Sequence, residues 1–173
     1  MGKIIIICLF IIIVLVVVLV SLYAIMIIKF RRMNRKIVKY NEERNLKENN
    51  VLIVYQPSKH GTIEKIVECI KETLTLKGIG YLSHTLTKEM EDYSKYKKVI
   101  FVAPVYFGEI HFEFLKKIVT YNDNNLIIIY NGLNKESHKE DEMIKKYFKK
   151  YKKIKLYTED IERVKPFINR EVL

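Results

Sequence analysis

Residues 97–112 read KKVIFVAPVYFGEIHF, an apolar run that stops at a proline and is followed by two adjacent aromatic residues and a glycine. The part over 97–103 has the continuous hydrophobic character of a strand that is buried on both faces. Two runs of the same kind flank it in the sequence, VLIVY at 51–55 and NNLIIIY at 124–130. Strands of this type are typical of a parallel sheet that carries helices on both faces.

Helical patterns alternate with these runs. Apolar residues recur at helical spacing after the first strand, and the same spacing predicts a series of helices over 62–77, 88–96, 109–121, 138–151 and 158–170. Thr158 is the expected N-cap of the last helix. Weaker, alternating runs at 81–86 and 153–157 complete a set of five strands.

This alternation predicts an α/β fold, a doubly wound five-stranded parallel sheet of order 2-1-3-4-5. Ligands of such sheets bind outside the carboxyl ends of the strands, beside strands 1 and 3. In this chain the loops at that place are 56–62 and 104–109. The sequence therefore predicts a ligand site between these two loops.

A long apolar segment precedes the predicted sheet. No charged residue occurs from Ile4 to Ile28, and as a helix the segment is about 37 Å long, enough to cross the ~30 Å core of a bilayer. A cleaved secretory signal has a shorter apolar region, of about 7–15 residues, before a small-residue cleavage site. We therefore predict a transmembrane anchor (1–28), a basic juxtamembrane helix or linker (29–48) and a soluble domain (49–173).

Charge sets the expected orientation of this anchor. Lys3 precedes the apolar segment, whereas six Lys or Arg residues follow it within 29–39. Basic residues favour the cytoplasmic side. The expected protein is thus a single-pass protein of the cell membrane whose C-terminal domain is cytoplasmic, with its basic segment close to anionic lipid headgroups.

The formal net charge of +11 does not by itself indicate a nucleic-acid-binding protein. More than half of this excess belongs to residues 1–48, and the rest clusters in KKYFKKYKKIK at 145–155. A solvated basic face near a negative membrane accounts for such a cluster, and beyond scattered tyrosines it offers no aromatic platform for bases. No nucleic-acid partner is predicted.

No metal site, disulfide framework or catalytic residue is predicted. Cys8 lies inside the apolar segment and Cys69 on a helical pattern. His60 and His111 have no partner at metal-ligand spacing, and we expect them in surface or loop positions. The sequence shows no Ser-His-Asp or Cys-His set, and the absence of a Gly-x-Gly-x-x-Gly pattern argues against a nicotinamide dinucleotide site.

The first loop has the chemistry of a phosphate site. It leads directly into a helix, whose N-terminal amides and partial positive charge attract anions. Ser58 and Thr62 add hydroxyl donors, Lys59 adds charge, and Gly61 allows close approach of a ligand to the backbone. An unliganded turn with a helix cap is the alternative interpretation.

The second loop contains Pro104, Val105, Tyr106, Phe107 and Gly108. Two aromatic rings side by side can lie against a flat ligand, although aromatic residues also serve as apolar covers of a sheet end.

Together these motifs resemble the flavodoxin superfamily. VLIVY-x-x-S-x-x-G leads into a helix and VIFVAPVYFGEIHFEFLKKI follows, so the resemblance extends over 49–173. It implies a flavodoxin-like fold with FMN as the cofactor: the first loop would wrap the phosphate, the second would flank the isoalloxazine ring, and a third, at 131–133, would contact the flavin edge. The implied cofactor-binding residues are Ser58, Lys59, His60, Gly61, Thr62, Pro104, Val105, Tyr106, Phe107, Gly108, Asn131, Gly132 and Leu133.

The first loop departs from the family pattern Ser/Thr-x-Thr-Gly-x-Thr. His60 and Ile63 stand where the second and third hydroxyl residues are usual. Elsewhere, the spacing aromatic-Gly-x-x-His-x-x-Phe, from Phe107 to Phe114, is similar to that of menaquinone-dependent protoporphyrinogen dehydrogenases.

The resemblance implies a membrane-anchored, FMN-binding protein of electron transfer, an electron carrier or an oxidoreductase linked to a quinone or another membrane redox partner. The flavin would carry the redox chemistry. The alternative is a cofactor-free adaptor of the same fold at the membrane surface.

Overall fold

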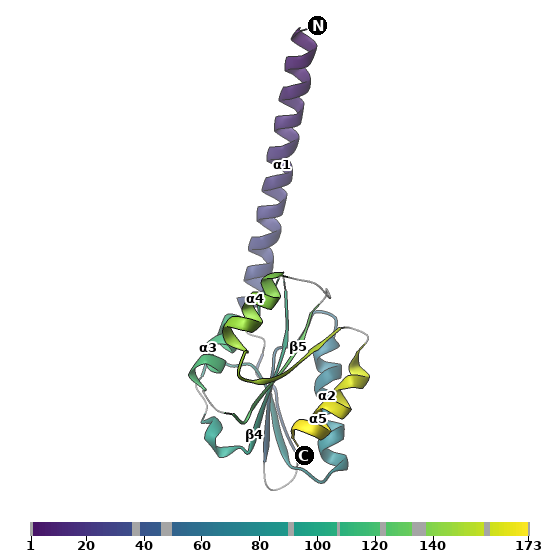
Figure 1. Ribbon diagram of the computed structural model, residues 1–173, viewed down its shortest axis with the longest axis vertical. Coiled ribbons are helices and arrows are strands. Elements are labelled where there is room, and N and C mark those ends of the chain that lie inside the picture. The colour runs from purple at the N-terminus through teal and green to yellow at the C-terminus, as the bar shows by residue number, and fades with distance from the viewer. Residues whose placement is uncertain are drawn as a thin grey trace. The chain divides into compact units, whose positions relative to one another are not determined.

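The computed structural model describes residues 2–35, 39–45, 50–89, 92–106, 108–121, 124–132, 138–157 and 160–172. The chain divides into two compact units, Met1–Lys36 and Ile37–Leu173. The first contains the long helix α1, Gly2–Arg35, and the second contains the sheet and the remaining helices (Figure 1).

Helix α1 includes a segment with the length and composition of a membrane span. This segment, Ile5–Lys29, is apolar and exposed along its length. The hydroxyl of Ser21 donates to the carbonyl of Val17 (2.8 Å), so this polar group is satisfied within the helix. The predicted apolar helix is therefore present, although a signal sequence near the N-terminus can pass the same test of length and apolar composition.

The second unit is built on a six-stranded sheet of order β1-β3-β2-β4-β5-β6. Its strands are β1 (Glu42–Asn45), β2 (Val51–Tyr55), β3 (Tyr81–Thr85), β4 (Lys98–Pro104), β5 (Leu126–Asn131) and β6 (Lys152–Leu156). Strands β2 to β6 pair in parallel. The predicted flavodoxin-like order 2-1-3-4-5 is confirmed for these five strands.

Strand β1 is an addition at the edge of the sheet. It pairs antiparallel with β3, with Glu42 opposite His84 and Asn45 opposite Tyr81. The charged segment 29–48 was predicted as a basic helix or linker, and the structure differs at Glu42–Asn45. These residues are largely exposed, and short charged edge strands are common in natural sheets.

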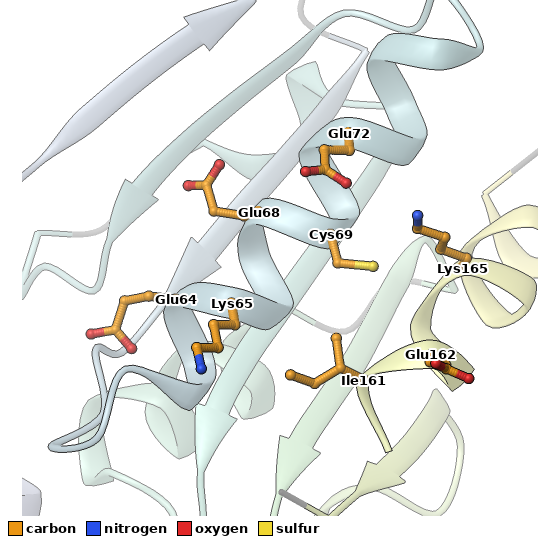
Figure 2. A pocket seen from close by; sticks show the side chains of 8 residues that line it. All are labelled: Glu64, Lys65, Glu68, Cys69, Glu72, Ile161, Glu162 and Lys165. Carbon is orange, nitrogen blue, oxygen red and sulfur yellow. The ribbon is translucent and has the colours of Figure 1, made fainter. Parts of the chain in front are cut away.

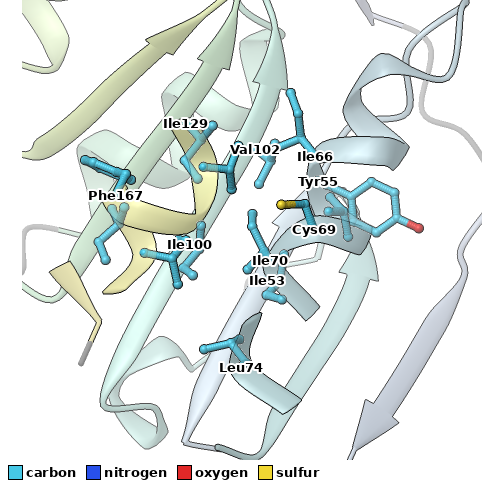
Figure 3. Packing of buried hydrophobic residues seen from close by; sticks show 14 of the residues in the cluster. Ile53, Tyr55, Ile66, Cys69, Ile70, Leu74, Ile100, Val102, Ile129 and Phe167 are labelled. Atoms are coloured by element: carbon cyan, nitrogen blue, oxygen red, sulfur yellow. The ribbon is translucent and has the colours of Figure 1, made fainter. Parts of the chain in front are cut away.

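Helices cover both faces of the sheet, and the alternation of strand side chains builds a core on each. Helices α2 (Thr62–Leu76) and α5 (Val164–Glu171) lie on one face, and α3 (Phe112–Thr120) and α4 (His138–Tyr147) on the other (Figure 1). On the first face Ile53 of β2, Ile70 of α2 and Phe167 of α5 belong to one cluster of buried side chains (Figure 3). Burying each such side chain contributes about 1.5–3 kcal/mol.

Two helices begin later than the sequence pattern predicted. Helix α3 begins at Phe112 because His111 is its N-cap, with Nδ1 accepting from the amide of Glu113 (3.2 Å). Helix α5 begins at Val164, after a 3₁₀ turn at Ile161–Arg163. A helix from 158 would place Pro166 in its interior, where proline breaks a hydrogen bond and clashes with the preceding turn. Thr158, the predicted N-cap, lies outside the described residues.

The helix predicted over 88–96 is reduced to a 3₁₀ turn, Tyr93–Lys95, within the part of this segment that is described. The Asp92 side chain caps the turn by accepting from the amide of Ser94 (3.1 Å). Asp and Ser favour such local side-chain bonds over a continuous helix.

Candidate functional site

The first loop joins β2 to α2 at the carboxyl end of β2. The amide of Gln56 donates to the carbonyl of Val102 (3.0 Å), which fixes the start of the loop on β4. Gly61 has φ of 71° and precedes the helix as its N-cap. A Cβ at Gly61 would meet no described atom within 4 Å. The positive φ therefore explains the glycine, and the space beside it is open to a ligand.

The polar groups of this loop are turned toward the first turn of α2. Ser58 donates from both its amide and its hydroxyl to Oε2 of Glu64 (3.1 Å each). The Ser58 hydroxyl oxygen in turn accepts from the amide of Ile63 (3.1 Å). Figure 2 shows Glu64 at the N-terminal end of α2, with its carboxylate on the side of the loop. The Glu64 carboxylate thus already accepts hydrogen bonds from the loop.

Gln56 carries a second unusual polar group. Its side chain is 5% exposed, and its Oε1 accepts no hydrogen bond from the residues that the structure describes. A buried acceptor without a donor costs about 1–3 kcal/mol. A ligand with hydroxyl or N–H donors would fit beside such a group, and a flavin mononucleotide carries both.

The second loop is a tight turn that follows β4. Tyr106 and Glu109 exchange two backbone hydrogen bonds of 3.0 Å, and Gly108 has φ of 75°. Pro104 is the last residue of β4, and Val105 is buried, with its amide donating to the carbonyl of Asn131 (2.8 Å). Phe107 lies outside the described residues.

Tyr106 connects the second loop to the first. Burial raises the pKa of its phenol, while a hydrogen bond with the backbone of Lys59 has the opposite effect, and the charge of Glu64 adds to the increase. The structure therefore brings together the two loops that sequence analysis assigned to one site. The phenol oxygen of Tyr106 lies at the first loop.

The third loop begins at the end of β5. Asn131 donates from Nδ2 to the carbonyl of Leu156 (3.3 Å), and the amide of Gly132 donates to the same oxygen (3.1 Å). These bonds hold the loop against β6. Leu133, the third residue predicted here, lies outside the described residues.

The two loop histidines differ in their surroundings. His60 is exposed, as expected, whereas His111 is 1% exposed and caps α3. His111 therefore lies in a loop position, one of the two positions expected, but it is buried, because the sequence does not show which side chain folds under the helix start. The described residues contain no group of three or more His, Cys, Asp or Glu side chains suited to a metal ion.

Sequence reasoning missed Glu64 and Gln56. Glu64 is the third residue of α2, where a capping-box acid reaches back toward the preceding loop. An acid at that position could have been recognised from the sequence as a candidate partner of the loop. Gln56 gave none, because its burial depends on the packing of the whole sheet end.

A groove lies along the flank of α2. It is an open groove of about 710 Å³ between α2 and the segment from Ile161 to Lys165 (Figure 2). Its lining includes the acids Glu64, Glu68, Glu72 and Glu162. Burial raises the pKa of the Cys69 thiol in this groove. The lining has no aromatic side chain, so it does not offer a platform for a flat ring.

A doubly wound parallel sheet with a helix-leading loop after its first parallel strand and an aromatic loop after its third is the architecture of a mononucleotide-binding domain. The chain belongs to the flavodoxin domain family, whose sequence profile matches residues 52–166. Domains of this family bind FMN at the strand-order switch point, which confirms FMN as the predicted cofactor at the level of the family.

Solved structures agree on the fold. Oxidised flavodoxin 2 from Bacillus cereus is 19% identical, with a TM-score of 0.52, and the match covers 71% of this chain and 97% of that chain. A short-chain flavodoxin associated with a non-canonical PDU bacterial microcompartment is also 19% identical, with a TM-score of 0.56, over 72% of this chain and 97% of that one. No curated protein matches the chain.

Proposed function

We propose that this protein holds FMN at the carboxyl ends of β2, β4 and β5 and uses it to transfer electrons. The contact of Tyr106 with the backbone of Lys59 is the observation that carries the proposal, because it joins the loop expected at the phosphate to the loop expected at the ring. The flavin supplies the redox chemistry when bound, and the protein binds and orients it.

Each loop has a distinct part in this proposal. The amides at the start of α2, next to Gly61 and Thr62, would hold the phosphate. Tyr106 and Phe107 would flank the ring, and residues 131–133 would lie at its edge. The buried oxygen of Gln56 supports a ligand that carries hydrogen-bond donors at this end of the sheet.

We further propose that α1 anchors the protein in the cell membrane, with the second unit on the cytoplasmic side. The exposed apolar segment Ile5–Lys29 supports the span. The basic residues that follow it support the orientation and a contact with anionic headgroups. An anchored flavin suits a redox partner within the bilayer, and a quinone has that location.

The test uses the full-length protein, purified in detergent. We expect visible flavin absorbance after purification or after addition of FMN, and release of FMN on denaturation. A colourless protein that leaves the fluorescence of added FMN unchanged would favour the second candidate, a cofactor-free adaptor. The Glu64 carboxylate in the first loop is the observation that favours this candidate.

A further inference from the structure

Glu64 accepts hydrogen bonds from donors of the first loop, the loop that we propose binds the phosphate. Its Oε2 accepts from the amide and from the hydroxyl of Ser58, at 3.1 Å in both cases. The Ser58 hydroxyl oxygen accepts from the amide of Ile63, so this helix amide is occupied as well. Three donors at the start of α2 therefore already have acceptors within the chain.

The carboxylate and a phosphate need the same surroundings. Both are anions that accept hydrogen bonds, and both are stabilised by the N-terminal end of a helix. A phosphate that takes the Ser58 donors must displace the Glu64 side chain. If Glu64 stays close, the two negative charges repel each other over a short distance.

The departures of this loop from the family pattern also weaken its ability to bind a phosphate. His60 and Ile63 replace two hydroxyl residues of the family pattern. The loop has therefore lost donors, and Glu64 competes for those that Ser58 supplies. Among the described residues, Lys59 and Lys65 are exposed cations that neighbour this site in the sequence, and no ion pair joins either of them to Glu64.

We propose that Glu64 is a specificity-determining residue, an internal competitor of the flavin phosphate. The inference rests on the proposed function, since it concerns the same site. In this protein the phosphate adds little to the binding of the flavin, and FMN binds only slightly more tightly than riboflavin, which has the same ring and no phosphate. Exchange of Glu64 for a neutral residue restores the preference for FMN.

The experiment compares two ligands on three forms of the full-length protein in detergent. The dissociation constants of FMN and riboflavin are measured by quenching of flavin fluorescence, for the wild type, Glu64→Gln and Glu72→Gln. Glu72 is the matched control, because it is an exposed acid on the same helix, two turns further along. Circular dichroism monitors the fold of each variant.

In the wild type we expect FMN to bind less than about tenfold more tightly than riboflavin, a difference of about 1.4 kcal/mol or less. Glu64→Gln should tighten FMN binding about tenfold and change riboflavin binding less than twofold. Glu72→Gln should leave both constants unchanged, although it removes the same charge.

Other results overturn the inference in distinguishable ways. A wild-type preference for FMN of a hundredfold or more contradicts it without any variant, even if Glu64→Gln does not fold. Weaker or unchanged FMN binding in Glu64→Gln, with riboflavin binding intact, also contradicts it but leaves the proposed flavin site in place. If the wild type binds neither flavin, the proposed function fails and this inference fails with it.

Discussion

At the scale of single residues, Gly61 and Gly78 can be compared directly, because both have a positive φ. They lie at the two ends of α2 with φ of 71° and 68°. Gly78 belongs to the helix C-terminus, where its amide donates to the carbonyl of Thr75 (3.0 Å) and that of Ile79 to Leu74 (2.9 Å). An added Cβ would meet no described atom within 4 Å at either glycine. An L-residue would thus be strained at either position, but the two positions lie at different distances along the helix from the candidate site.

We predict that Gly61→Ala and Gly78→Ala each lower the free energy of unfolding by about 1 kcal/mol, because an L-residue with positive φ is strained. Only Gly61→Ala should also weaken FMN binding, since its methyl group enters the space next to the first loop. Denaturant unfolding and FMN titration of the full-length protein measure the two effects. Equal FMN affinities in both variants would contradict the placement of the phosphate loop.

Part of the candidate site was predictable at this scale. Ser58, Gly61 and Tyr106 were proposed as site residues from residue type, spacing and the family resemblance, and the structure places Tyr106 against the first loop. The role of Glu64 was not predicted, because it depends on how far a flexible side chain reaches back. The hydrogen bond from the Asn131 side chain to β6 was missed for a similar reason. The sequence does not show which neighbouring strand a side-chain amide will contact.

At the scale of secondary-structure elements, β1 pairs with β3 through its backbone and is linked to helix α2 by an ion-pair cluster. Lys71 of α2 pairs with Glu43 of β1 and with Glu68 of its own helix (2.8 Å to Glu68). The Lys71 side chain is 7% exposed, while both carboxylates are more than half exposed. Asn45 adds a hydrogen bond to the hydroxyl of Thr75 (2.8 Å). These contacts attach the segment that follows α1 to the edge of the sheet.

Replacement of Lys71 by Met should loosen β1 and leave the rest of the sheet intact. Because the partner carboxylates are exposed, we expect a loss of about 1 kcal/mol or less, seen as up to fivefold faster hydrogen exchange of the amides in Glu42–Asn45. Exchange in β4 serves as the internal reference. Lys65→Met, at an exposed position of the same helix, should leave β1 unchanged. Unaltered exchange in β1 of Lys71→Met would show that backbone pairing alone holds the strand.

Tyr151 links the start of β6 to the end of α3. Its hydroxyl donates to the carbonyls of Ile118 (3.0 Å) and Tyr121 (3.3 Å). Burial raises the pKa of this phenol, so the folded state retains the proton to higher pH than the unfolded chain does. The contribution of Tyr151 to stability is therefore fully present below the ordinary tyrosine pKa of about 10 and is lost as the pH rises through the higher folded value.

We accordingly predict that Tyr151→Phe is less stable than the wild type at pH 8, by about 1 kcal/mol for the lost hydrogen bonding. The difference should shrink above pH 10, because the wild-type phenol then ionises. Urea unfolding at a series of pH values measures both, with Tyr147→Phe as a control whose hydroxyl lies on the neighbouring helix α4. A difference that stays constant up to pH 11 would contradict this assignment.

The elements themselves were predictable where burial sets their composition. The continuous apolar runs of β2, β4 and β5 identified the central strands, because strands buried on both faces need apolar residues at every position. The start of α5 depends on Pro166 and that of α3 on a histidine cap, and spacing alone shows neither. β1 was not predicted, since edge pairing uses backbone groups and leaves a charged sequence unconstrained.

At the scale of the whole molecule, the short link between the two units bears on function. Helix α1 ends at Arg35, and the carbonyl of Lys39 already accepts from the hydroxyl of Thr85 on β3 (3.2 Å). Fully extended, the four Cα–Cα steps from Arg35 to Lys39 span at most about 14 Å. If α1 crosses a bilayer, the second unit stays near that bilayer. Tethering over so short a link raises the effective concentration of a membrane partner.

We predict that the tethered flavin passes electrons faster to quinone in its own bilayer than to quinone in another bilayer. The FMN-loaded protein is placed either in nanodiscs that contain menaquinone, or in menaquinone-free nanodiscs mixed with protein-free discs that carry the quinone. The flavin is reduced without oxygen, and its reoxidation is followed by visible absorbance. We expect reoxidation at least about tenfold faster in the shared disc, since the anchor keeps flavin and quinone at one membrane. Equal rates would remove the link between anchor and quinone, while FMN binding itself would remain in place.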